Sequence, residues 1–293
     1  MKGAALRIIT RTFSNKFESG KTFGSVCLSL PAAQRRPYIQ SMSTASSLQS
    51  PVCAVCGKTI QGQYIRDYWG NNYHRSHEKT HPACYYCGRL ISKRSTGGGS
   101  RYSDGRMICT LCRERAIESK ESGLAVLNEA HDLLEQHGIL LRPFRPKFSL
   151  LDRQTLRKYS KSGNELGFTQ AGRRSDRRTG RIIELKIQVF ILEGLPYEAF
   201  LATAAHELMH AWIHLNGRQD AARWFKEGSC NLAAYLVLRG KRSYEAEYQI
   251  EQMRRQTDRI YGRGFRKVLR FAQRRGTAAW LKAVRTQKRL PLL

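Results

Sequence analysis

The residues with the clearest chemical signature are two histidines and a glutamate in the pentapeptide His206-Glu207-Leu208-Met209-His210. Histidines four positions apart lie on one face of a helix, roughly 6 Å from each other, so two neutral imidazoles can bind a single Zn²⁺. Glu207 lies between them and is placed to act as a general base toward a water molecule. The pattern predicts the chemistry of a zinc peptidase.

Two further residues can complete such a site. Glu227 begins the next helical segment, with 16 residues between it and His210, and can serve as the third ligand while a fourth position stays open for water. Asn231, one turn later, can hydrogen-bond a ligand histidine. The alternatives are a carboxylate that interacts with the helix dipole and a solvated amide. Spacing does not select an oxyanion-stabilising donor among Tyr235, Tyr244, Tyr248 and His214.

Six of the eight cysteines fall in C-x2-C pairs, a spacing typical of structural zinc sites rather than of a disulfide framework. The predicted ligands are Cys53, Cys56, His74 and His77 for one ion, and Cys84, Cys87, Cys109 and Cys112 for another. Gly57 and Gly88 follow their pairs, where the turn favours positive φ. His81 is an alternative ligand of the first site. Both sites are closed and therefore structural.

The surrounding sequence predicts the elements that hold these residues. Periodicity favours helices over 116–137, Tyr197–Leu215 and Trp224–Leu238, and a basic helical region over Ser243–Gln287. Alternation favours a strand over Arg181–Leu192, which we expect beside the active site, where it can bind an extended peptide. Short strands or turns are expected near Ile139–Leu141 and Phe148–Leu151, Asp152 can cap a short helix, and residues 161–180 are expected to form a loop.

The charge balance points to polyanionic or acidic partners. Lys+Arg number 51 and Asp+Glu 23, a formal net charge of +28, while 41% hydrophobic residues suffice for a packed core. No apolar run is long enough to predict a transmembrane helix. Residues 1–50 are basic and hydroxylated, as in a disordered tail or an organelle transit peptide. We therefore expect an intracellular, cytoplasmic protein, with a mitochondrial or plastid location as the alternative.

Several stretches together resemble the DA-one family of LIM-domain, ubiquitin-activated peptidases. They are Cys53-Ala-Val-Cys56, Tyr73-His74-Arg75-Ser76-His77, Cys84-Tyr-Tyr-Cys87, Asp104-Gly105-Arg106-Met107-Ile108-Cys109-Thr-Leu-Cys112, Gly194-Leu195-Pro196, Ala205-His206-Glu207-Leu208-Met209-His210-Ala211-Trp212 and Glu227-Gly228-Ser229-Cys230. The resemblance spans about Cys53 to Leu238. It implies a zinc endopeptidase acting on intracellular proteins, with His206, His210 and Glu227 as ligands, Glu207 as base, and ubiquitin or ubiquitinated proteins among its partners.

We therefore expect an α+β protein. Residues 1–50 form a disordered basic segment, 51–115 a LIM-like module with two structural zinc ions, and 116–293 a mainly helical zincin-like peptidase domain with a small sheet and one catalytic zinc ion. Two other functions remain open. The basic stretch Arg254–Arg275, with Tyr261, Phe265 and Phe271, suits a nucleic-acid-binding protein. A non-catalytic interaction adaptor is the other alternative.

Overall fold

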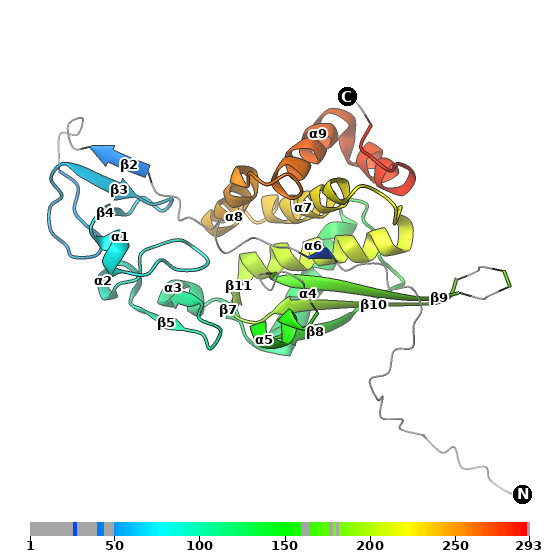
Figure 1. The fold of residues 1–293 in the computed structure, drawn as a ribbon, viewed down its shortest axis with the longest axis horizontal. Helices are drawn as coiled ribbons and strands as arrows, with labels where there is room; N and C mark the ends of the chain where they lie inside the picture. The colour runs from blue at the N-terminus through cyan, green and yellow to red at the C-terminus, as the bar shows by residue number, and fades with distance from the viewer. Residues whose placement is uncertain are drawn as a thin grey trace, which may run out of the picture.

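The structure is a computed structural model that describes residues 26–27, 40–43, 50–159, 165–175, 178–179 and 182–291. Most of the predicted basic segment 1–50 lies outside these residues. Two short parts of that segment lie inside, and both form strands, β1 (Val26–Cys27) and β2 (Gln40–Ser43). The remaining helices and strands fall into a cysteine-rich end and a larger helical end (Figure 1).

The cysteine-rich end consists of short strands and single helical turns. β2 pairs with β3 (Gln63–Arg66), and β3 pairs with β4 (Asn72–His74), all antiparallel. A second hairpin joins β5 (Gly99–Arg101) and β6 (Met107–Cys109). Three helical turns complete this end: α1 (His77–Thr80), α2 (Lys93–Thr96) and α3 (Thr110–Arg113).

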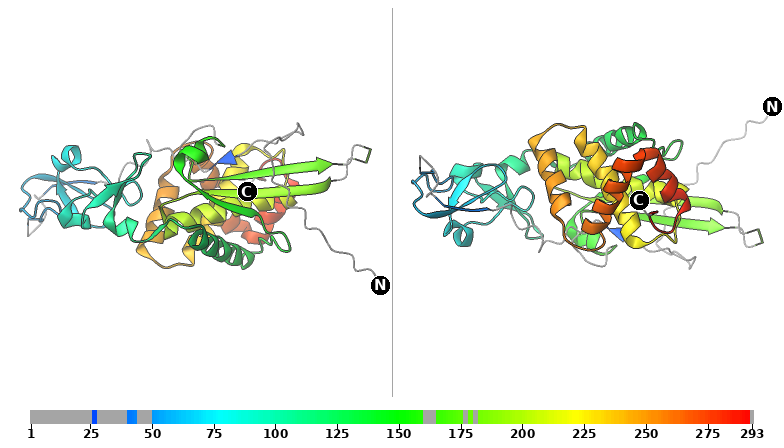
Figure 2. Two further views of the ribbon diagram at one scale, coloured as in Figure 1. Left: turned by 90° about the horizontal axis from the view of Figure 1, so that it is seen from below. Right: turned by 90° about the horizontal axis from the view of Figure 1, so that it is seen from above.

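The larger end contains a four-stranded sheet in the order β1-β9-β10-β8. β10 (Ile182–Leu192) is antiparallel to β9 (Gly167–Ser175) and parallel to β8 (Lys147–Leu151). β1 adds to the outer side of β9 in the antiparallel direction. The tips of β9 and β10 project beyond the helices (Figure 2). β10 is therefore an inner strand, and β9 presents its outer edge to β1.

Helices are layered against this sheet. α6 (Tyr197–Asn216) packs on β9 and β10, α4 (Lys120–Glu135) on α6 and β8, and α7 (Arg223–Arg239) on α6. α9 (Gly262–Thr286) covers α7, while α8 (Tyr244–Arg255) contacts α6, α7 and α9. The short helix α5 (Arg153–Arg157) lies against β10. Because α6 is enclosed on every side, nearly all of its side chains are buried, including polar ones.

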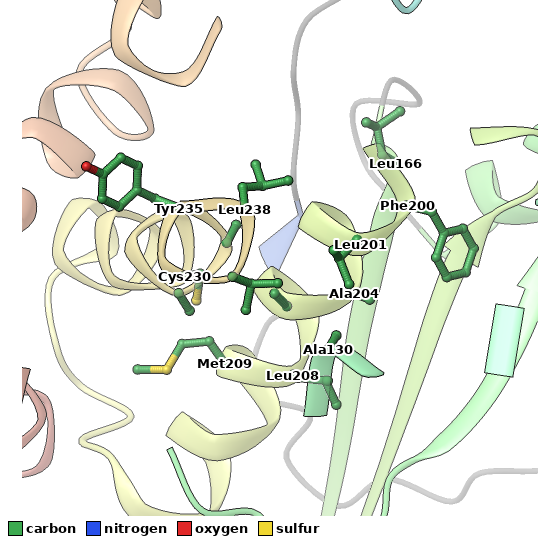
Figure 3. Packing of buried hydrophobic residues seen from close by; sticks show 14 of the residues in the cluster. Ala130, Leu166, Phe200, Leu201, Ala204, Leu208, Met209, Cys230, Tyr235 and Leu238 are labelled. Atoms are coloured by element: carbon green, nitrogen blue, oxygen red, sulfur yellow. The ribbon is translucent and has the colours of Figure 1, made fainter. Parts of the chain in front are cut away.

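Strand pairing just before α6 fixes where this helix starts. Pro196 cannot donate a backbone hydrogen bond and suits a helix start, and it belongs to β11 (Leu195–Pro196), which pairs with β7 (Ala116–Ile117). Leu201, Leu208 and Met209 then belong to one buried core with Ala130 of α4 and Cys230 of α7 (Figure 3). The helix ends at Gly217. The predicted helix Tyr197–Leu215 thus differs from α6 by one residue.

Other expectations need correction. Residues 161–180 do not form a continuous loop, because Gly167–Ser175 is strand β9, with Phe168 and Thr169 buried. Pairing with β10 stabilises this strand although its own sequence lacks an apolar alternation. The strand predicted over Arg181–Leu192 exists as β10, but both of its edges are already paired. It therefore has no free edge for an added peptide, and the edge beside α6 belongs to β9.

Two helix predictions also differ at their ends. The region 116–137 begins with strand β7 and becomes helical only at Lys120, where the Ser119 side chain accepts from the Ser122 amide. The region Ser243–Gln287 divides into α8 and α9, with Asp258 accepting backbone amides in the turn between them. Ile139–Leu141 is not a strand, whereas Asp152 caps α5 as predicted. The fold is thus mixed, with helices around small sheets.

None of the helices in the described part of the chain is both long and apolar enough to span a bilayer.

Candidate active site

The structure brings His206, His210 and Glu227 together at the contact between α6 and α7. The Nε2 atoms of the two histidines lie 3.1 Å apart. Glu227 Oε2 lies 3.4 Å from His206 Nε2 and 3.5 Å from His210 Nε2. All three side chains are buried. One turn of α6 and the first turns of α7 therefore aim three ligand-type atoms at one point.

These distances can be tested against the geometry that zinc requires. With zinc–ligand bonds of about 2.0–2.1 Å, two ligands of a tetrahedral ion lie roughly 3.3–3.4 Å apart. The three observed separations lie within about 0.3 Å of that value. In addition, neither carboxylate oxygen of Glu227 has a hydrogen-bond partner, although both are buried. The residues fit a three-ligand zinc site, because a bound cation would supply the partner that the carboxylate lacks.

Asn231 orients one of the imidazoles. Its Oδ1 lies 2.9 Å from His206 Nδ1, and its Nδ2 donates to the carbonyl of Tyr261 at 3.4 Å. The second bond fixes which end of the amide faces the histidine, so the carbonyl oxygen accepts a proton held on Nδ1. The lone pair of His206 is then on Nε2, which faces Glu227 and His210.

Glu207 lies on the sheet side of α6. Its Oε2 accepts a hydrogen bond of 2.7 Å from the Thr169 hydroxyl of β9, while its Oε1 is buried without a partner. Gly167, two residues earlier in β9, leaves the space that this side chain fills, because a Cβ there would come within 3.1 Å of Glu207 Oε1. Thr169 and Gly167 carry no local signal that could have identified them, since the contact depends on the placement of β9.

The two carboxyl groups of the site differ in acidity. Burial raises the pKa of Glu207 to about 8, against a smaller opposing effect of His210 and the Thr169 hydroxyl. Burial also disfavours ionisation of Glu227, but the two imidazoles outweigh it and lower the pKa of this carboxyl to about 2. Glu227 is therefore charged, as a metal ligand must be, whereas Glu207 can hold or release a proton near neutral pH.

Cys230 also lines the site. Its thiol and the ligand nitrogens of His206 and His210 all lie within 4.8 Å of one another. Burial raises the pKa of this thiol well above its ordinary value. The signal for Cys230 was present in the sequence, because it lies three positions after Glu227, on the same face of α7.

The candidate oxyanion donors lie elsewhere or have other contacts. The Tyr235 hydroxyl accepts from Arg239 at 3.0 Å and from Arg254 at 3.5 Å. The Tyr248 ring packs edge-on against Tyr68 and tilted against Trp69, and Tyr244 is 76% exposed. Among the described residues, Tyr235 has no hydrogen bond or ion pair with the three ligand-type side chains. His214 lies one turn beyond His210 on α6 and is half-buried.

The cysteine-rich end assembles both predicted ligand sets. Ligand-type atoms of Cys53, Cys56, His74 and His77 lie within 4.8 Å of one another, and so do those of Cys84, Cys87, Cys109 and Cys112. Gly57 and Gly88 have φ of 76° and 74°, as predicted. Cys230 and the six paired cysteines are free thiols. These two clusters can each bind a zinc ion.

Ionisation of the Cys53 thiol is favoured locally at the first cluster. Burial acts against it, yet backbone amides of Cys56, His74 and Val55 lower the pKa of Cys53 to about 7. His81 lies outside this set. Its ring packs edge-on against His77 at 5.0 Å, and its Nδ1 lies 2.9 Å from the Thr80 hydroxyl. The cluster thus has four ligand-type side chains without it.

Comparisons with known proteins show which chains this one is similar to. Residues 126–246 match the family model described as "DA1-like: Protein DA1". The chain is 26% identical over 227 residues to LIM domain-containing protein HDR3 of Oryza sativa subsp. japonica, covering 65% of this chain and 45% of that protein. It is 27% identical over 230 residues to Protein DA1-related 2 of Arabidopsis thaliana, covering 65% of this chain and 42% of that protein.

A third relative is Protein DA1 of Arabidopsis thaliana, 27% identical over 230 residues, with 64% of this chain and 42% of that protein covered. The chain thus spans less than half the length of these curated relatives. No solved structure matches it. Residues 126–246 therefore form a DA1-like domain, and the relatives named for DA1 and for a LIM domain support assignment of this chain to the DA-one family.

Proposed function

We propose that this protein is a zinc-dependent peptidase whose catalytic ion is held by His206, His210 and Glu227. The observation that carries this proposal is the triangle of ligand-type atoms with sides of 3.1, 3.4 and 3.5 Å. Similarity to the DA-one family adds support, because the motifs of this chain resemble those of that family of LIM-domain peptidases. The substrates proposed are intracellular proteins.

The chain's own residues then have defined roles. When bound, zinc supplies Lewis acidity toward the scissile carbonyl and toward an attacking water. Glu207 takes a proton at Oε1, the oxygen without a partner, and delivers it to the leaving amine. Thr169 holds the other oxygen in place. Asn231 keeps His206 in the tautomer that offers Nε2.

The cysteine-rich end is proposed to be a LIM-like module with two structural zinc ions that recruits substrates or partners. Ubiquitin or ubiquitinated proteins are candidate partners by family resemblance alone. A cytoplasmic location is proposed because paired C-x2-C cysteines are typical of metal sites in a reducing compartment. The full chain would then contain about three zinc ions, whereas a non-catalytic adaptor would contain about two.

The test is to replace Glu207 with glutamine. We expect Glu207→Gln to keep the zinc content of the wild type and to lose at least 10³-fold in kcat/KM toward a protein substrate, because the proton acceptor is removed and the ligands are not. Glu247→Gln, an exposed glutamate of α8, is the control. Proteolysis that survives unchanged in Glu207→Gln would refute the assignment.

A second candidate function, polyanion binding, rests on α9. This helix contains no acidic residue. Arg263, Lys267, Arg270 and Arg274 are exposed along one side of it, over roughly 16 Å, and within the described chain they form no ion pair. The structure corrects the stacking part of this hypothesis, because Tyr261, Phe265 and Phe271 are buried and cannot reach bases.

Binding through α9 would therefore be electrostatic and independent of nucleic-acid sequence. The measurement is retention on duplex DNA as a function of salt. We expect Arg263→Gln/Arg270→Gln/Arg274→Gln to reduce the slope of log K against log salt by roughly two to three. Retention of the wild type that does not change with salt would reject phosphate binding.

A further inference from the structure

The position of β1 suggests a relation between the N-terminal part of the chain and the candidate active site. β1 lies along the outer edge of β9, with Val26 opposite Thr169 and Cys27 opposite Phe168. It is the short blue strand beside α6 in Figure 1. Thr169 is the residue whose hydroxyl holds Glu207. A segment more than 140 residues distant in sequence thus pairs with the part of the sheet that contacts the candidate base.

Among the described strands, β9 has the sheet edge to which an extended peptide can add beside the candidate active site. β10 is an inner strand, and β8 lies at the opposite edge. β9 contacts α6 directly, since a Cβ at Gly167 would meet Thr203 at 2.7 Å and Glu207 Cγ at 3.0 Å. Neighbouring strands are about 4.8 Å apart. An extended peptide on β9 would therefore run within one strand spacing of the residue that touches Glu207.

The burial of the candidate site residues also bears on where a polypeptide can bind. His206, Glu207 and Glu227 are each 0% exposed and His210 is 4% exposed. A polypeptide substrate cannot reach these side chains in this conformation. Strand addition recognises the peptide backbone rather than the side chains, so the edge of β9 can accept many sequences. A segment that is already paired with this edge prevents another peptide from pairing there.

We propose that the outer edge of β9 beside Glu207 is a docking site for an extended polypeptide, and that the segment Val26–Cys27 of the same chain occupies it in the resting molecule. The identification of the external ligand as a substrate rests on the proposed peptidase function. The docking site itself rests on the pairing of β1 with β9.

The pairing is suited to be reversible. A two-residue strand contributes few backbone hydrogen bonds, so a longer substrate strand can displace it. What keeps β1 in place is its attachment, because β2 of the same segment pairs with β3 in the cysteine-rich end, with Gln40 opposite Arg66 and Met42 opposite Tyr64. Only 12 residues separate the two strands. This tether raises the effective concentration of β1 at β9.

The experiment compares three full-length proteins, all with Glu207→Gln so that nothing is cleaved. The first has the wild-type segment. The second, Val26→Pro/Cys27→Pro, removes two backbone N–H donors and disfavours pairing. The third, Val26→Ala/Cys27→Ala, keeps both donors and is the matched control. The probe is a fluorescent peptide with the sequence of residues 22–31, and its affinity is measured by anisotropy.

We expect the proline protein to bind the peptide at least tenfold more tightly than the wild-type and alanine proteins. We also expect faster hydrogen exchange in β9 of the proline protein without peptide. Of the Phe168 and Thr169 amides, the one that exchanges faster in the wild-type protein should exchange at least tenfold faster in the proline protein. Equal affinity and equal exchange in all three proteins would overturn the proposal. Neither readout needs catalysis, so failure of the peptidase assignment would be visible separately.

In the background with Glu207 intact, the proline substitutions should lower KM for a protein substrate several-fold and leave kcat nearly unchanged. An unchanged KM alongside tighter peptide binding would show that the edge binds an extended peptide that is not the substrate, which overturns the substrate part of the proposal.

Discussion

At the residue scale, two side chains compete for the third ligand position beside His206 and His210. Glu227 Oε2 lies 3.4 and 3.5 Å from the imidazole nitrogens, and Cys230 is within 4.8 Å of them. The pKa of Glu227 is lowered to about 2, whereas burial raises the pKa of the Cys230 thiol. Zinc binds the ionised form of either group, so the carboxylate is the better ligand.

We therefore predict that Glu227→Gln lowers the zinc content of the purified chain by about one ion, while Cys230→Ser leaves it unchanged. Zinc per chain is measured by elemental analysis after gel filtration. The opposite pattern, with loss of one ion only in Cys230→Ser, would show that sulfur rather than carboxylate completes the site.

The raised pKa of Glu207 predicts a pH dependence of folding stability. In His210→Ala, which lacks one of the proposed zinc ligands but keeps both cysteine clusters, we expect burial still to raise this pKa. The folded state then retains a proton that the unfolded state releases above pH 4.5, the ordinary value. Stability should fall as pH rises from about 4.5 to 8, by at most roughly 1.4 kcal/mol per pH unit, and then level off.

Denaturant midpoints between pH 5 and 9 measure this effect. His210→Ala/Glu207→Gln should lack the decline, because glutamine does not titrate. Parallel curves for the single and double variants would show that Glu207 has no raised pKa in the folded protein.

At the scale of elements, the site depends on how closely α7 approaches its neighbours. Gly228 follows Glu227 and faces α9, where a Cβ would lie 2.6 Å from the carbonyl carbon and oxygen of Gly264. Backbone atoms cannot rotate away as a side chain can. The two glycines therefore allow α9 to cover α7 while α7 presents Glu227 to α6.

Gly228→Ala should consequently destabilise the protein by roughly 1–3 kcal/mol and weaken zinc binding at the site, because α7 must shift. Gly240→Ala, at the end of the same helix, is the control, since its Cβ would meet nothing closer than 3.5 Å. Denaturant unfolding and zinc titration measure both effects. Equal stability of the two variants would show that the contact between α7 and α9 is not tight in solution.

At the scale of the whole molecule, the two cysteine clusters are connected to the core differently. Cys84, Cys87, Cys109 and Cys112 belong to the same buried cluster as α6 and α7, whereas Cys53 packs in a small separate one. Cys112 in α3 is four residues from β7, which pairs with the strand that leads into α6. Arg106, beside the second cluster, donates to the carbonyl of Glu193 at 3.1 Å.

Loss of the zinc ion proposed for the second cluster should therefore affect the candidate active site. Loss of the zinc ion proposed for the first cluster should not. We predict that Cys112→Ser lowers the free energy of unfolding by at least about 2 kcal/mol and weakens zinc binding at His206 and His210. The matched variant Cys56→Ser should unfold only the distal end. Thermal unfolding with limited proteolysis distinguishes the two, and identical behaviour would mean that both clusters are equally peripheral.

Local sequence was sufficient to predict α6 and α7 and the grouping of the ligand-type side chains. α6 and α7 agree with the predicted ranges within one residue at each end, because helix periodicity and stop signals are encoded by neighbouring residues. For the same reason the i, i+4 histidines and the paired cysteines could be found from spacing. The sequence did not predict the gap between α8 and α9, because the stretches on both sides of it are helical in pattern.

Tertiary structure alone decided what surrounds those ligands. The order β1-β9-β10-β8, the hydrogen bond from Thr169 to Glu207 and the burial of Tyr261, Phe265 and Phe271 all depend on contacts between residues far apart in the chain. Strand pairing and burial reflect the stability of the whole packed molecule, so no short window of sequence contains them. Spacing thus determined which atoms could bind metal, and packing determined which strand lies beside them.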